Sequence, residues 1–107
     1  MLMDWIALVV AGFFEAVWAV GLKSTCGFTR FWPSVYTVAA MVVSVFLLSW
    51  SVRTLPIGTA YAVWTGIGAV LTVVAGMVLY EESRDVLRML FVVMIVAGII
   101  GLKVVTK

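Results

Sequence analysis

The chain is too apolar to be an ordinary soluble protein. Of its 107 residues 65% are hydrophobic and 11% are charged, whereas a typical soluble domain is about 25% charged. Its formal net charge of +2 comes from few, scattered residues, which argues against a nucleic-acid partner. With no histidine and a single cysteine, Cys26, the chain has no histidine-based metal site or catalytic triad and no intrachain disulfide. The composition indicates an integral membrane protein, and nothing in it points to an enzyme, a metal or a cofactor.

Four apolar stretches predict an all-α membrane protein with four transmembrane helices. The predicted helices are residues 2–22, 33–52, 57–80 and 86–105. Each has about 20 residues, the length that crosses a hydrocarbon core of ~30 Å. Because the connections are short, neighbouring helices must run antiparallel, and residues 1–107 form one transmembrane domain. The first stretch is too long for the apolar core of a signal peptide and lacks a basic leader, so we expect a retained helix.

Glu15 is the residue on which a functional interpretation depends. Its nearest charged neighbours are Asp4, eleven residues before it, and Lys23, eight residues after it. On a helix these separations are roughly 16 Å and 12 Å, so Glu15 lies near mid-membrane. A carboxylate there costs about 2.5 kcal/mol or more, and intramembrane ionisable residues usually mark ion or proton pathways. We therefore predict a proton or cation site; the alternative is a neutral Glu15 that only hydrogen-bonds to another helix.

Two residues share the helical stripe of Glu15 and suit a binding cavity. Gly12 lies one turn before Glu15, and its small size leaves room for a ligand. Trp18 lies three residues after Glu15 and can donate its indole N–H. The first helix therefore predicts a carboxyl group with space on one side and a hydrogen-bond donor on the other.

The second and third helices offer further polar side chains at suitable depths. Ser44 is the hydroxyl group nearest mid-membrane in the second helix, although it could instead bond back to its own helix. Tyr61 and Trp64 share a face of the third helix. Tyr61 is close enough to a helix end to be an interfacial anchor instead, whereas the deeper Trp64 is predicted to line the cavity.

Small residues in the third and fourth helices suggest motion and assembly. Gly66 and Gly68 weaken the middle of the third helix and predict a hinge; the alternative is close helix packing. In the fourth helix Ala97 and Gly101 have the spacing of a helix-pairing motif, and Gly98 lies beside them. We therefore predict that the fourth helix is a dimer interface.

The basic residues are almost evenly divided between the two sides of the membrane. One side holds three of them and the other holds four: Arg53, Lys103 and Lys107, against Lys23, Arg30, Arg84 and Arg88. This balance gives no firm orientation under the positive-inside rule. Transporters often place their site between two inverted repeats, so we predict a chain that inserts both ways and pairs with its own inverted copy. The alternative is that a weak bias or an assembly partner sets one orientation.

Four segments make the chain resemble the small multidrug resistance family. They are FFEAVWA at residues 13–19, GFTRFWPS at 27–34, LPIGTAYAVWTGIGAV at 55–70 and AGIIGLK at 97–103. The resemblance implies an antiparallel homodimer in the bacterial inner membrane, with a first-helix glutamate shared by protons and cations. Within the family the chain resembles the guanidinium exporters. Trp18 stands where exporters of bulky aromatic or quaternary ammonium cations typically have glycine, and Met41 where they often have an aromatic residue.

The resemblance also implies a set of binding residues and a mechanism. The implied binding network is Glu15, Trp18, Ser44, Tyr61 and Trp64, with Gly12 lining it. The implied mechanism is proton-coupled antiport, in which planar guanidinium and protons compete for the carboxylate. A polyspecific cation exporter, a non-transporting assembly subunit and a requirement for a second, different chain stay open as alternatives.

Overall fold

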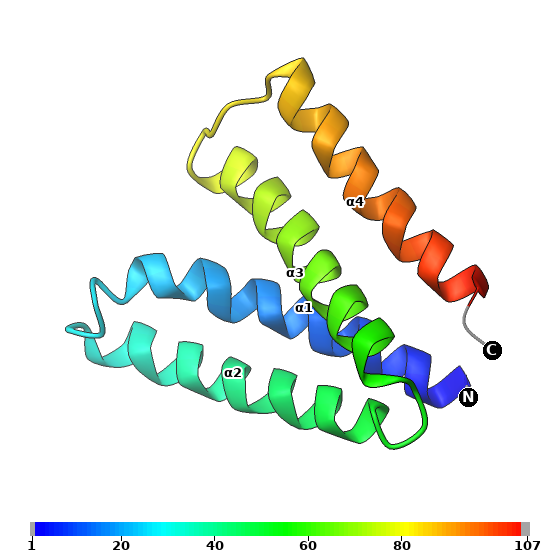
Figure 1. Ribbon diagram of the computed structural model, residues 1–107. Coiled ribbons are helices and arrows are strands. Elements are labelled where there is room, and N and C mark those ends of the chain that lie inside the picture. The colour runs from blue at the N-terminus through cyan, green and yellow to red at the C-terminus, as the bar shows by residue number, and fades with distance from the viewer. Residues whose placement is uncertain (1, 106–107) are drawn as a thin grey trace.

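The computed structural model describes residues 2–105, which fold into four helices joined by short loops (Figure 1). The helices are α1 (Leu2–Ser24), α2 (Phe31–Ser51), α3 (Ile57–Leu79) and α4 (Val86–Val105). All four are long and apolar enough to cross a membrane. Relative to the ranges expected from the sequence, α1 ends two residues later and α2 begins two residues earlier.

The helices form two hairpins that meet along α1 and α3. Figure 1 shows α1 and α2 side by side, α3 crossing α1, and α4 lying beside α3. The first turn of α1, the last turn of α4 and the α2–α3 loop lie at what we call the terminal end. The α1–α2 loop (residues 25–30) and the α3–α4 loop (residues 80–85) lie at the opposite, or loop, end. This arrangement is the one that short connections between antiparallel spans require.

The buried core lies toward the terminal end, between α1, α2 and α3. Its members are Trp5, Leu8, Ala11, Leu55, Ala60, Val63 and Trp64. On α1 they recur every three or four residues, the period of one helix face. Lipid tails are as apolar as these side chains, so close packing and interhelical hydrogen bonds stabilise such a bundle more than the hydrophobic effect does.

Two serines of α2 fasten it to α1. Ser44 Oγ donates to the carbonyl oxygen of Ala11 at 2.6 Å, and the single hydroxyl proton of Ser51 is shared between the carbonyl oxygen of Asp4 at 3.1 Å and that of Leu47 in its own helix at 2.9 Å. The two serines are seven residues apart along α2, and the two acceptor residues are seven residues apart along α1. Seven residues make two helical turns, so the spacings match on these antiparallel helices. Both serines are fully buried. This pair of bonds sets the register of α2 on α1.

The helix α4 lies at the edge of the bundle. None of its residues, all of which the structure describes, is buried. Ile99 packs toward Gly66 of α3, where an added Cβ would lie 2.8 Å from Ile99 Cδ1. Gly98 and Gly101 have open space around them, and Ala97 is exposed. The small residues of α4 are therefore available to a neighbour, and their role in a dimer stays a prediction.

The glycines of α3 lie in an unbroken helix. The helical assignment continues through Gly66 and Gly68 without interruption. Each glycine allows a side chain of another helix to come close: Ile99 at Gly66 and Glu15 at Gly68. Close packing, the alternative to a hinge, thus describes their contacts in this structure. The hinge itself stays a prediction.

Candidate functional site

The Glu15 carboxyl group lies in the contact between α1 and α3. It rests on the backbone of Gly68, where any side chain would overlap Oε1 of Glu15. Oε1 is buried and has no hydrogen-bond partner within residues 2–105. A buried polar atom without a partner is unfavourable by about 1–3 kcal/mol. A proton on the carboxyl group or a cationic ligand beside it would relieve this cost, so the position suits a binding site.

Trp18 offers a matching donor on the same helix. Its Nε1 is also buried and has no hydrogen-bond partner in the described part of the chain. The ring is half-buried and packs against the edge of the core. The first helix thus carries one open acceptor and one open donor three residues apart. Both atoms are enclosed by this chain, so a ligand or a second chain reaches them only when the surrounding side chains move.

Ser44 and Trp64 form a hydrogen-bonded relay that ends on the backbone of α1. Trp64 Nε1 donates to Ser44 Oγ at 2.9 Å, and Ser44 Oγ donates in turn to the Ala11 carbonyl oxygen at 2.6 Å. In an α-helix the same carbonyl accepts the backbone N–H of residue 15. The relay from Trp64 through Ser44 is therefore connected to the backbone of Glu15, and not to its side chain. Here the Ser44 hydroxyl bonds neither to its own helix nor to the Glu15 side chain.

The remaining predicted residues lie on either side of this relay. Tyr61 is 57% exposed, and its ring centroid is 5.7 Å from that of Trp64. Gly12 is buried where α1 meets α3, and an added Cβ there would lie 2.6 Å from Ile67 Cγ2. One chain thus brings Ser44, Tyr61 and Trp64 together and leaves the Glu15 side chain in a separate contact.

The sequence did not reveal the role of two groups in the site, Gly68 and the carbonyl group of Ala11. Gly68 was predicted as part of a hinge, yet it lies directly under the Glu15 carboxyl group. It lies four residues after Trp64, so its face of α3 could have been inferred from helical spacing. The Ala11 carbonyl is a backbone group, and no residue type indicates it.

Grooves open to the surface lie between Glu15 and the loop end. An apolar groove of about 510 Å³ lies between α1, α2 and α3, with Phe13, Tyr36 and Leu71 among its lining residues. A second cavity of about 240 Å³ is lined partly by charged side chains, including Lys23 and Glu82. Four candidate spans, with an acid at the contact between two of them, are the features of a small multi-pass membrane protein.

Comparison with known proteins identifies the family. Residues 3–95 match the family described as Small Multidrug Resistance protein. The chain is 60% identical over 104 residues to a guanidinium exporter of Citrobacter freundii, covering 97% of this chain and 99% of that protein. It is 59% identical over 104 residues to a guanidinium exporter of Escherichia coli (strain K12), with the same coverage. The chain therefore belongs to the small multidrug resistance family, a family of multi-pass membrane transporters, and the resemblance noted from the sequence is confirmed.

Proposed function

We propose that this protein exports guanidinium and small guanidinyl cations in exchange for protons across the bacterial inner membrane. The observation that carries the proposal is the buried, unpartnered Oε1 of Glu15 against Gly68. Relatives that share about 60% of its residues over almost the full length are named guanidinium exporters. A carboxylate with a fixed plane suits a flat cation that presents paired N–H donors.

Exchange follows from competition at one carboxyl group. A proton and a guanidinium ion cannot both occupy Glu15, so release of one accompanies binding of the other. The indole N–H of Trp18 can donate a hydrogen bond to a carboxylate oxygen. The aromatic rings of Tyr61 and Trp64 can line the site that binds the cation. A bend at Gly66 and Gly68 would open the site to alternate sides of the membrane. No cofactor or covalent step is needed.

An antiparallel homodimer supports this mechanism better than a single chain. Within one chain Tyr61 is turned outward and the Glu15 side chain is separate from the Ser44 relay. A second, inverted copy could bring its own exposed aromatic and acidic groups to a shared cavity near mid-depth. The outward-facing small residues of α4, Ala97, Gly98 and Gly101, provide a surface for such pairing.

The deciding experiment measures proton movement driven by a guanidinium gradient. The purified protein is placed in liposomes that contain a pH-sensitive dye, and guanidinium, a monosubstituted alkylguanidinium or tetrapropylammonium is added outside. We expect proton flux with the first two cations and little with the third, which is bulky and has no N–H donor. Flux that prefers tetrapropylammonium would instead indicate a polyspecific exporter. Absence of flux with every cation would indicate a non-transporting subunit.

The orientation of the chain tests the dimer separately. The three-to-four division of basic residues predicts that C-terminal reporter fusions lie on both sides of the membrane. Two lysines added to one side should bias insertion and reduce activity when that variant is expressed alone. A single orientation in every molecule would contradict the antiparallel homodimer and require a different partner chain.

A further inference from the structure

A second carboxylate faces a polar cavity at the loop end of the α1–α3 contact. The cavity has a volume of about 240 Å³, space for roughly eight water molecules at liquid density. Its walls include Ala19, Lys23, Thr72, Gly76, Glu82 and Arg88. It is therefore large enough for a small hydrated cation and carries an acid to bind one.

This cavity is next to the Glu15 site. Ala19 lies one turn beyond Glu15 on α1, and Thr72 lies one turn beyond Gly68 on α3, which is about 6 Å on each helix. Glu15 and Gly68 are in contact with each other. The cavity thus begins one turn from the Glu15 carboxyl group and extends to the loop end, where water meets the protein.

The α3–α4 loop holds Glu82 over this cavity. Glu81 has a φ of +52°, a left-handed conformation that turns the chain back on α3. The backbone N–H of Glu82 then donates to the Gly76 carbonyl oxygen at 3.2 Å. Its side chain lies so close to Gly76 that an added Cβ there would be 2.5 Å from Oε1. Glycine at position 76 lets the carboxylate rest against the α3 backbone, and a larger residue there would push the Glu82 side chain away from this place.

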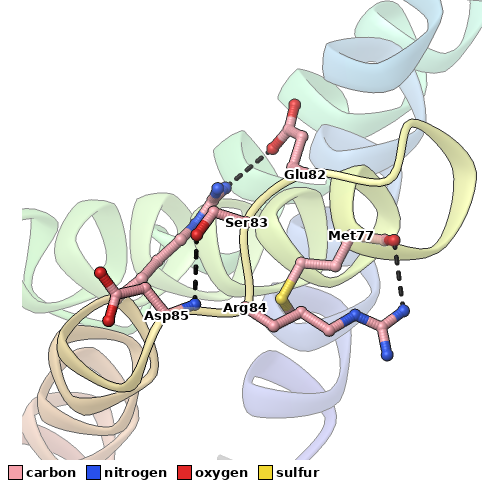
Figure 2. Close-up of polar contacts among 6 residues, drawn as sticks. Met77, Glu82, Ser83, Arg84 and Asp85 are labelled. Carbon is pink, nitrogen blue, oxygen red and sulfur yellow. Dashed lines mark hydrogen bonds and ion pairs between the residues drawn. The ribbon is translucent and has the colours of Figure 1, made fainter.

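Glu82 already binds a guanidinium group, that of Arg88. Arg88 Nη2 donates to Glu82 Oε1 at 2.8 Å; this bond is the dashed line that ends on the labelled Glu82 in Figure 2. Figure 2 also shows Arg84 of the same loop directed to another partner, the Met77 carbonyl oxygen, at 3.3 Å. The head group of Arg88 has the same chemistry as the exported cation. We propose that Glu82 is a second guanidinium site, at the loop-end entrance to Glu15, where substrate displaces the Arg88 side chain; this inference rests on the proposed function.

The energetics favour a weak, exchanging site. The Arg88 and Glu82 side chains are 32% and 41% exposed. Ion pairs at such exposure favour the paired state by at most about fivefold, so free guanidinium at moderate concentration can compete. Lys23 lies with its Nζ 4.3 Å from the centroid of the Tyr80 ring and keeps a positive charge beside the cavity. A cation at Glu82 is therefore held loosely and can pass on to Glu15.

A binding measurement tests the site without requiring transport. In a Glu15→Gln background, which removes the main site, the Nε–Hε signal of Arg88 is followed by NMR as guanidinium chloride is added. We expect a saturable shift toward the position that this signal has in the Glu15→Gln, Glu82→Gln double variant. The Arg84 signal is the internal control and should stay in place. An unmoved Arg88 signal, or an equal shift with potassium chloride at the same ionic strength, would overturn the proposal, because screening alone weakens exposed pairs.

Transport kinetics test the role of the site on the pathway. Glu82→Gln should raise the KM for guanidinium about two- to fivefold with little change in the maximal rate. Arg88→Gln removes the tethered competitor and should lower the KM by a similar factor. Glu81→Gln, in the same loop but outside the cavity lining, is the matched control. If both variants shift the KM in the same direction, the pair is only structural and the proposal is wrong. If the unmodified protein gives no flux, the proposed function fails, whereas the NMR titration still decides whether Glu82 binds guanidinium.

Discussion

The two halves of the α1–α3 contact differ in what they enclose. Toward the terminal end the helices are closely packed: Leu8 and Ala11 are 0% exposed, and Gly12 lies against Ile67. Open grooves border this contact in both halves: one of about 330 Å³ in the terminal half, beside Val9 and Val63, and two of about 510 and 240 Å³ from Glu15 toward the loop end. Of these three, only the 240 Å³ groove has an acidic side chain, Glu82, in its lining. Glu15 lies at the boundary between the two halves. The difference shows how a chain of 107 residues combines a fixed support with a polar approach to its acid: one half holds the buried core and the other holds the charged lining.

The hydrogen bonds follow the same division. The bonds from Ser44 and Ser51 to α1, and the bond from Trp64 to Ser44, lie between Glu15 and the terminal end. The buried donor and acceptor without a partner in the described chain, Trp18 Nε1 and Glu15 Oε1, belong to the boundary and the loop-end half, as does the buried Thr37 Oγ1. Satisfied polar groups stabilise the packed half, whereas the buried groups without a partner lie from Glu15 toward the loop end.

Removal of the titrating group should have the largest effect on this division. Glu15→Gln keeps the shape of the side chain, so the packed half and the helix content should be unchanged. Guanidinium-driven proton flux should fall to the level of empty liposomes, because the glutamine cannot exchange a proton for a cation. Flux and circular dichroism are measured on the same preparation. Proton-coupled uptake that survives in this variant would show that Glu15 is not the coupling site.

A methyl group at the boundary should have the next largest effect. In Gly68→Ala the new Cβ overlaps Glu15 Oε1 and forces the carboxyl group to move. Because a displacement of about 1 Å at a reacting group can reduce a rate 100-fold, we expect transport to fall about 10- to 100-fold. Gly58→Ala is the matched control, since nothing lies within 4 Å of its added Cβ. Equal transport by the two variants would contradict the role of Gly68 as the surface under Glu15.

Loss of the relay should change stability more than transport. Ser44→Ala leaves Trp64 Nε1 without its acceptor and removes the bond to Ala11, which should lower the free energy of unfolding by about 1–2 kcal/mol. Ser49→Ala, at an exposed position of the same helix, should have a much smaller effect. Denaturant titration in detergent measures both. If Ser44→Ala unfolds at the same denaturant concentration as Ser49→Ala, the relay does not support the packed half.

The four candidate spans could be predicted from the sequence, and Glu15 could be singled out in it, because both depend on patterns along one helix. The apolar stretches predict the four spans, and the spacing of three and four residues between Thr37, Ala40 and Ser44 predicts a face of α2 that the structure buries. The depth of Glu15 follows from its distance to the nearest charges. These properties are local, so they can be inferred before the packing is known.

The partners of the predicted residues could not be obtained in the same way. Ser44 bonds to a backbone carbonyl, and every residue carries one, so the sequence does not distinguish Ala11 from its neighbours. The contact of Gly68 with Glu15 depends on how far α3 is shifted and rotated relative to α1. The place of Glu82 depends on the left-handed backbone at Glu81. All three depend on distances between elements, which helical periodicity leaves undetermined.

The bond from Trp64 to Ser44 also determines which part of α3 is free to tilt. Trp64 is fixed through Ser44 to the main chain of α1, so α3 cannot slide there without breaking a buried bond. A hydrogen bond is lost over a short increase in distance, so α3 stays fixed at Trp64 until this bond breaks. Gly66 lies two residues after Trp64 in α3. If the predicted hinge at Gly66 and Gly68 bends, the segment of α3 from Gly66 to Leu79 would move as a lever arm anchored at Trp64, and α4, which packs on α3, would move with it.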